Sequence, residues 1–180
     1  MSQEKVIELS KVKLALLTFG AITFVLLGAW FLSMEVHEIE SQRKFNSPVL
    51  VYGIGVVSIV FFGMCAFIGL KKLFDDSPGL VVNTEGILDN SSGISAGIIP
   101  WKEIVGIGEY TVQKQKFISI LVKDPEKYVN NGNLLKRIAN RANLKMCGTP
   151  VNISANSLKI DYDELLEVIT KFHLNSIEKT

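Results

Sequence analysis

Cysteine and histidine are scarce in this chain of 180 residues, which holds only two of each. Cys65 falls in a long apolar stretch and Cys147 in a polar part of the chain, so we do not expect them to form a disulfide. His37 and His173 lie far apart, and no Cys/His spacing typical of a zinc site occurs. We therefore expect no metal site, no cofactor and no disulfide framework.

Sequence signatures of the common enzyme classes are also missing. There is no Gly-x-Ser-x-Gly motif, and the Ser/Gly segment 91–97 lacks the Gly-Lys-Ser/Thr ending of a phosphate-binding loop. Trp101, which follows Pro100, is better explained as a core anchor than as a ligand platform. Asp75 and Asp76 are adjacent acids in a linker, where solvation is the simplest role. The sequence predicts a protein that is not an enzyme and has no catalytic residues.

Charge is absent from two long stretches, residues 14–34 and 45–70. A helix rises about 1.5 Å per residue, so roughly 20 apolar residues cross the hydrocarbon core of a bilayer. Both stretches are long enough, and Pro48 is tolerated in the first turn of a helix. We predict transmembrane helices over 14–34 and 48–70. The first ends in bulky residues instead of a small-residue cleavage site, so we interpret it as a retained anchor.

The short connector 35–47 predicts that the two spans form a helical hairpin, residues 14–70, after an N-terminal segment 1–13. Basic residues are more frequent beside the termini than in the connector: Lys11, Lys13, Lys71 and Lys72 against Arg43 and Lys44. Cytoplasmic loops carry the excess of Lys and Arg, so both termini are predicted to be cytoplasmic. Neither span holds an ionisable group, which argues against a transporter or channel. Small residues in the spans fit packing within the hairpin better than a dedicated dimer motif, although a homo-oligomer stays open.

The remaining part, residues 73–180, has the composition of a soluble domain with nearly balanced charge, which gives no indication of nucleic-acid binding. Short β-rich runs separated by turn residues predict an antiparallel sheet. These runs are residues 80–83, 87–89, 98–100, 105–112 and 117–122. Asp124 and Pro125 then predict a helix start, and Gly148 ends the helical region.

A last amphipathic helix is predicted after residue 160. Asp161 and Glu164 have the spacing of a capping box at its start. Its apolar positions fall on one face, which should pack on the sheet: Leu165, Leu166, Ile169 and Phe172. The predicted fold class is thus membrane-anchored α+β: a two-helix transmembrane hairpin, then a small antiparallel β-sheet domain with a C-terminal helix.

Two segments carry a resemblance to a known family. They are 99–104 (Ile-Pro-Trp-Lys-Glu-Ile) and 148–155 (Gly-Thr-Pro-Val-Asn-Ile-Ser-Ala), the latter followed by Leu158 and Lys159. With the two spans, the chain resembles a family of uncharacterised bacterial inner-membrane proteins that carry a pleckstrin-homology-like cytoplasmic domain. The resemblance covers essentially all residues from about Lys11 on. It implies a multi-pass protein of the inner membrane but no activity.

Between residues 127 and 145 there are five basic residues and no acid. Four lie in the predicted helix and are candidate lipid-headgroup contacts: Lys136, Arg137, Arg141 and Lys145. The same helix carries an apolar arc: Leu134, Leu135, Ile138, Ala139 and Ala142. A basic amphipathic helix is typical of association with an anionic membrane surface. The sequence equally fits a helix that packs on the sheet and leaves a solvated basic edge, and the two interpretations are compatible.

Two functions follow from these patterns. The first is a non-enzymatic, membrane-anchored binding or scaffold module, which presents its domain to lipid headgroups or to an unknown protein partner at the cytoplasmic face. The alternative is a membrane-embedded interaction subunit, such as an accessory or immunity-type protein, whose transmembrane hairpin binds the partner. Exchange of the hairpin for an unrelated anchor separates the two, since only the second function needs these particular spans.

Overall fold

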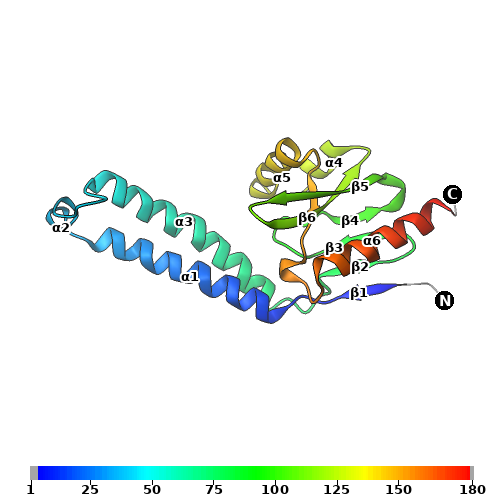
Figure 1. Ribbon diagram of the computed structural model, residues 1–180, viewed down its shortest axis with the longest axis horizontal. Coiled ribbons are helices and arrows are strands. Elements are labelled where there is room, and N and C mark those ends of the chain that lie inside the picture. Colours follow the sequence, from blue (N-terminus) through cyan, green and yellow to red (C-terminus); the bar gives the residue numbers. More distant parts are fainter. Residues whose placement is uncertain (1–3, 179–180) are drawn as a thin grey trace. The chain divides into compact units, whose positions relative to one another are not determined.

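The computed structural model describes residues 4–178, which form two compact units (Figure 1). One unit is residues Lys11–Asp75. The other joins the described part of Met1–Ser10 with Asp76–Thr180. The chain therefore leaves the second unit after its first strand and returns to it after the hairpin.

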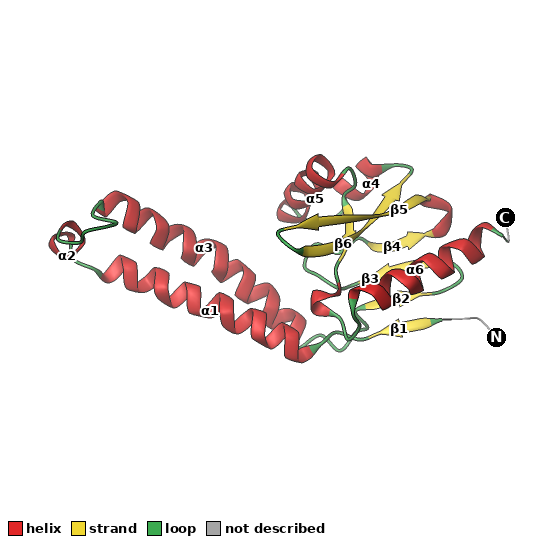
Figure 2. Cartoon of the chain, in the orientation of Figure 1, coloured by secondary structure: helices red, strands yellow, loops and turns green. Residues whose placement is uncertain are grey.

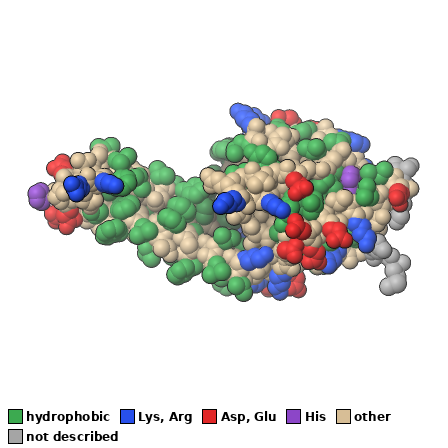
Figure 3. Space-filling model, viewed as in Figure 1, with side chains coloured by type: hydrophobic (Ala, Val, Ile, Leu, Met, Phe, Trp, Pro, Cys, Tyr) green, Lys and Arg blue, Asp and Glu red, His purple; other side chains and the backbone are tan. Residues whose placement is uncertain are grey.

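The first unit is a pair of long helices, α1 (Lys11–Ser33) and α3 (Pro48–Leu73), joined through the short helix α2 (Val36–Glu40). By length and composition, both long helices can cross a membrane. Hydrophobic side chains cover much of their visible surface (Figure 3). The prediction of two long apolar helices is confirmed, although α1 begins at Lys11 and α3 continues to Leu73.

Close contact between α1 and α3 depends on glycines at the crossing point. A Cβ on Gly28 would lie 2.8 Å from the carbonyl oxygen of Gly55, and a Cβ on Gly55 would lie 2.9 Å from that of Gly28. Phe24 and Phe62 stack across the same interface with ring centroids 4.4 Å apart. The expectation that small residues serve packing within the hairpin is confirmed at these two glycines.

The second unit begins with β1 (Lys5–Ile7), a strand that the sequence analysis did not predict. It pairs antiparallel with β2 (Leu80–Val82), which pairs with β3 (Gly86–Asp89), and β3 pairs with β4 (Gly97–Pro100). These strands form a four-stranded sheet in the order β1-β2-β3-β4. Part of the N-terminal segment 1–13 therefore belongs to this sheet.

A second, three-stranded sheet contains β5 (Ile104–Val112), β6 (Gln115–Val122) and β7 (Val151–Ile153). The prediction of one sheet is corrected to two. The break lies at Pro100, which has no N–H to donate, and at the 3₁₀ turn η1 (Trp101–Glu103) that follows it. Trp101 is buried there, and its Nε1–H donates to the carbonyl oxygen of Asn83 at 2.8 Å, as expected for a core anchor.

Three helices complete this unit: α4 (Pro125–Val129), α5 (Leu134–Cys147) and α6 (Tyr162–Ile177) (Figure 2). A 3₁₀ turn, η2 (Ala155–Ser157), follows β7. Asp124 and Asp161 cap α4 and α6 as predicted, each accepting a backbone N–H with its side chain.

Helix α6 contacts β2 of one sheet and β6 of the other. Leu165 and Ile169 are fully buried in this contact, whereas Leu166 and Phe172 are only half-buried. The core-facing stripe predicted for this helix therefore centres on two of its four residues. The fully buried core of the unit consists mainly of aliphatic side chains from both sheets: Leu80, Val82, Ile87, Ile99, Ile118, Ile120 and Ile153.

Candidate functional site

Helix α5, the basic helix of the sequence analysis, has well-defined ends. Asn133 caps it by accepting the N–H of Lys136 at 3.0 Å. Gly148 ends it with a left-handed φ of 74°, a conformation in which glycine is favoured. The next residue, Thr149, is buried, and its hydroxyl donates to the carbonyl oxygen of Ile120 on β6. This hydrogen bond ties the end of α5 to the sheet and so restricts rotation of the helix about its own axis.

The inner face of α5 is formed by Asn140, Leu144 and Cys147 rather than by the predicted apolar arc. Asn140 is 2% exposed, and its Nδ2 donates to the carbonyl oxygen of Tyr128 at the end of α4 at 3.1 Å. Leu144 and Cys147 are half-buried on the same side. A buried position on a helix is usually occupied by an apolar residue. Here an amide occupies it, because its N–H donates a hydrogen bond to a carbonyl oxygen at a helix end.

The apolar arc lies on the opposite, outer face. Leu134, Leu135 and Ile138 are 72%, 57% and 58% exposed, and Met146 extends the same surface at 61%. Ala142 is exposed and Ala139 half-buried. Helix α5 thus packs on the sheet, against β7, through its other side. The arc is an apolar surface of the described unit.

The four candidate headgroup contacts do not all lie together. Arg137, Arg141 and Lys145 are exposed and follow one another at four-residue spacing, so they form one row along α5. Lys136 is half-buried on another side of the helix, against Gly132. The structure thus groups three of the four residues.

Two members of the basic row contact neighbouring groups. Arg137 Nε donates to the carbonyl oxygen of Gly132 at 3.0 Å, and Arg141 Nη2 lies 3.3 Å from Glu126 Oε2. Both side chains of the Arg141–Glu126 pair are more than half exposed, and such pairs contribute little to stability. The guanidinium groups are held near the surface of α5 and remain accessible to an anion.

A cavity of about 220 Å³ lies beside the C-terminal half of α5. Its apolar lining includes Ile94, Tyr110, Phe117 and Met146, and serine and asparagine side chains surround them. Met146 is common to this cavity and to the exposed arc. Cys147 also lines it, but burial raises the pKa of this thiol, so it is protonated at neutral pH and a poor nucleophile.

A polar cluster joins η1 to α4. Glu103 accepts hydrogen bonds from Lys127 Nζ at 2.6 Å and from the Tyr128 hydroxyl at 2.7 Å. These two bonds lower the pKa of Glu103. Burial, followed by the hydrogen bond to Glu103 and its negative charge, raises the pKa of Tyr128. Both groups therefore stay in the charge states that hold the cluster together, which fits a structural role rather than proton transfer.

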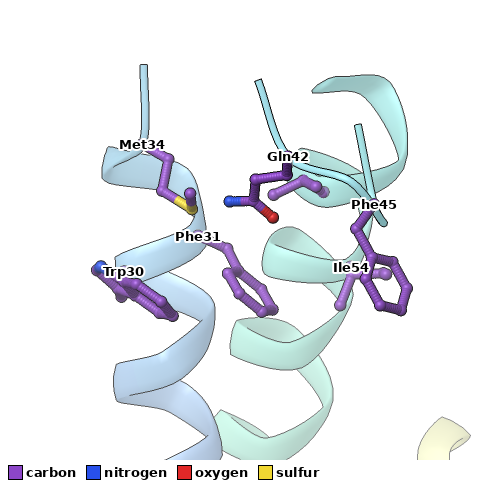
Figure 4. Close-up of a pocket in the computed structure, with 7 residues that line it drawn as sticks. Trp30, Phe31, Met34, Gln42, Phe45 and Ile54 are labelled. Atoms are coloured by element: carbon purple, nitrogen blue, oxygen red, sulfur yellow. The ribbon is translucent and has the colours of Figure 1, made fainter. Parts of the chain in front are cut away.

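Within the hairpin unit, a second cavity of about 220 Å³ lies where the connector meets the long helices (Figure 4). Trp30, Phe31 and Met34 at the end of α1 line one side, and Ile54 of α3 and Phe45 of the connector line the other. Gln42 is a polar residue of the same lining. The hydroxyl of Tyr52 ties the two helices together by donating to the carbonyl oxygen of Met34 at 2.8 Å.

Metal-binding and catalytic clusters were not expected from the sequence. Within residues 4–178, no group of three or more His, Cys, Asp and Glu side chains is placed to hold a metal ion. His173 lies beside Trp101, with ring centroids 5.5 Å apart. The features that offer a binding surface are thus the outer face of α5 and the two cavities.

Comparison with known proteins gives no match for this chain among family models, curated proteins or solved structures. The proposed function therefore rests on the residues and contacts described above.

Proposed function

We propose that this protein is a non-enzymatic, membrane-anchored binding module. In this proposal the α1–α3 hairpin spans the bacterial inner membrane, and the two-sheet unit is held at the cytoplasmic face. There the unit contacts anionic lipid headgroups or a protein partner. No cofactor takes part.

The observation that carries the proposal is the pairing of β1 with β2. Strand β1 precedes α1 and strand β2 follows α3, and Ile7 lies opposite Leu80 in the antiparallel register. Two strands of one sheet lie on the same side of a bilayer, so both ends of a spanning hairpin must emerge on that side. The four lysines at these ends, Lys11, Lys13, Lys71 and Lys72, outnumber the two basic residues of the connector, which favours the cytoplasm as that side.

The strand and helix order supports the finer proposal that this unit is pleckstrin-homology-like. The resemblance implies antiparallel strands closed by an amphipathic helix. The unit has a four-stranded and a three-stranded antiparallel sheet, and α6 contacts both. In this interpretation the transmembrane hairpin is an insertion between the first and second strands.

Fusions of alkaline phosphatase test the orientation, because the enzyme is active only outside the cytoplasm. We expect a fusion after residue 180 to be inactive and a fusion within the connector 41–47 to be active. Fusions of green fluorescent protein at the same positions should give the opposite pattern. An active C-terminal fusion would overturn the cytoplasmic placement, and equal activity at both positions would overturn the spanning hairpin.

The alternative function, a membrane-embedded interaction subunit, is favoured by the cavity at the connector end of the hairpin. Its lining by Trp30, Phe31 and Ile54 offers an apolar site for a side chain of another membrane protein. A photo-crosslinking amino acid at Phe31 in living cells tests it, with the same group at exposed Ile98 of β4 as control. A discrete protein adduct only from Phe31 supports the alternative, and adducts only with lipid contradict it.

A further inference from the structure

We propose that α5 docks on the anionic bilayer surface as an in-plane amphipathic helix. Its outer apolar face enters the headgroup region, while Arg137, Arg141 and Lys145 contact lipid phosphates. This inference deepens the proposed function and rests on the anchoring of the chain by its hairpin. It concerns lipid alone, so capture of a protein by this surface would contradict it.

The shape of the apolar face supports this docking. At about 100° per residue, Leu134, Ile138, Ala142, Leu135 and Met146 fall within about 120° of the helix circumference. All five are exposed and lie on one helix face. Soluble surfaces usually carry such side chains singly, and a contiguous stripe indicates a surface that contacts something apolar.

The charges beside the stripe indicate what that surface is. At the same 100° per residue, Arg137 and Arg141 lie along one edge of the stripe, and Lys145 projects just inside that edge. No acidic residue occurs in α5. Figure 3 shows Lys or Arg side chains next to hydrophobic ones over this helix. An apolar face with a basic border is complementary to acyl chains beneath anionic headgroups. Two copies of this chain would instead bring identical basic rows together, which opposes self-association through α5.

The connections of the unit to the hairpin place it near a bilayer. Only residues 8–10 separate β1 from α1, and residues 74–79 separate α3 from β2. At about 3.5 Å per extended residue, the longer connection reaches roughly 20 Å. A domain held this close by two connections meets the membrane at a high effective concentration, so even a short helix without other anchors can dock.

The interior of the unit leaves this face available. Asn140 is bound to Tyr128, and Thr149 is bound to Ile120, so α5 cannot rotate to bury the stripe without breaking both contacts. Lys136 is half-buried on a different side of α5 and is excluded from the lipid contact. This makes Lys136 an internal control for the three basic residues of the row.

The test uses the full chain in nanodiscs, with both native cysteines replaced by alanine and a polarity-sensitive fluorophore on Ile138→Cys. Discs contain either phosphatidylcholine alone or phosphatidylcholine with phosphatidylglycerol. The control fluorophore is on Ile98→Cys, because Ile98 is at least as exposed as Ile138, 72% against 58%, and its strand β4 contains no Lys or Arg. Circular dichroism checks that each labelled chain is folded.

We expect the Ile138 fluorophore to shift to the blue and to be quenched by spin-labelled lipid in anionic discs only. The Ile98 fluorophore should show neither effect. The triple change Arg137→Gln, Arg141→Gln and Lys145→Gln should abolish the difference between the two disc types, whereas Lys136→Gln should preserve it. Raised salt should weaken the signal, because exposed charges are screened over about 8 Å at physiological ionic strength.

Each contrary outcome has a distinct meaning. A folded chain that co-purifies with discs but keeps the Ile138 fluorophore in water overturns the docking of α5 and leaves the anchor intact. Equal quenching in neutral and anionic discs overturns the role of the basic row. A blue shift without lipid quenching indicates contact between copies and also overturns the inference. Failure of the chain to enter discs would instead contradict the proposed function.

Discussion

At the scale of single residues, six glycines in the long helices have different roles. Gly28 and Gly55 lie where α1 and α3 approach each other, and a Cβ on either would meet the opposite backbone. A Cβ on Gly69 would meet the side chain of Thr18, whereas Gly20, Gly53 and Gly63 have open space around the position of a Cβ. The sequence shows glycines of both kinds, but only the structure tells which of them permit close packing.

A leucine at Gly28 should therefore destabilise the hairpin, whereas a leucine at Gly20 should be tolerated. Overpacking of a close contact costs about 1–3 kcal/mol. Thermal unfolding of the full chain in detergent, followed by circular dichroism of the helices, measures the difference. Equal melting temperatures for Gly28→Leu and Gly20→Leu would show that the helices do not cross at Gly28.

Glu103 gives the domain a predictable response to acid. Hydrogen bonds from Lys127 and Tyr128 lower its pKa below the ordinary value of 4.5. A carboxylate with a lowered pKa in the folded state stabilises the fold at pH above its unfolded pKa. That stabilisation is lost as the pH falls through the lower, folded pKa.

We expect Glu103→Gln to lower the melting temperature at pH 7 and to have a progressively smaller effect as the pH falls through the lowered pKa of Glu103. The physical reason is that wild-type Glu103 is itself protonated in acid, where it no longer differs in charge from glutamine. Calorimetry of both proteins over this pH range measures the change. A constant difference between them at all pH values would contradict the role of the charge.

At the scale of elements, α5 and α6 have similar amphipathic patterns but opposite outcomes. The apolar face of α6 is buried against a strand of each sheet, with Leu165 and Ile169 fully enclosed. The apolar face of α5 is exposed, because Asn140, Leu144 and Cys147 form its inner side. Periodicity identifies the apolar face of a helix, but it does not say what that face meets.

The burial of α6 predicts unequal effects of the same substitution at two leucines of that helix. Leu165→Ala removes a fully enclosed side chain and should destabilise the domain by about 2–5 kcal/mol. Leu174→Ala removes one that is more than half exposed and should change stability by no more than about 0.5 kcal/mol. Urea unfolding of the two variants measures both values, and similar midpoints would mean that α6 is not docked through Leu165.

At the scale of the whole molecule, the helical hairpin interrupts the β-domain instead of preceding it. Ile7 and Leu9 are buried, the backbone of Ser10 bonds to Ser157, and that of Lys159 bonds to Glu8. Residues 73–180 alone would lack this strand and leave the edge of β2 open, which is a hazard for aggregation. The boundary at residue 73 therefore omits a part of the fold.

A protein in which a short Gly/Ser linker replaces residues 11–75 should be soluble, monomeric and cooperatively folded. Ile7 and Leu80 are paired neighbours, so a turn of a few residues can join the strands. Residues 76–180 without the first ten should be less stable or aggregate. Size-exclusion chromatography and thermal unfolding compare the two, and equal stability would show that β1 contributes nothing.

Much of this architecture could be predicted from local sequence. Uncharged stretches of sufficient length predict the long helices, Asp124 and Asp161 predict helix starts, and Gly148 predicts a helix end. These features depend on a few adjacent residues and on the period of the apolar positions. Such information is contained in any window of the chain.

Contacts between distant segments decided the rest. Strand β1 has only three residues and takes its partner from beyond the hairpin, so no local pattern identifies it. The division into two sheets depends on the turn after Pro100 and on the pairing of β7 with β6, which are separated in the chain by α4 and α5. The outward position of the α5 stripe depends on Asn140 meeting the carbonyl oxygen of Tyr128, a hydrogen bond that exists only after the helices pack. Hydrophobic periodicity is local, whereas the choice of which faces are enclosed is made by the packed chain as a whole.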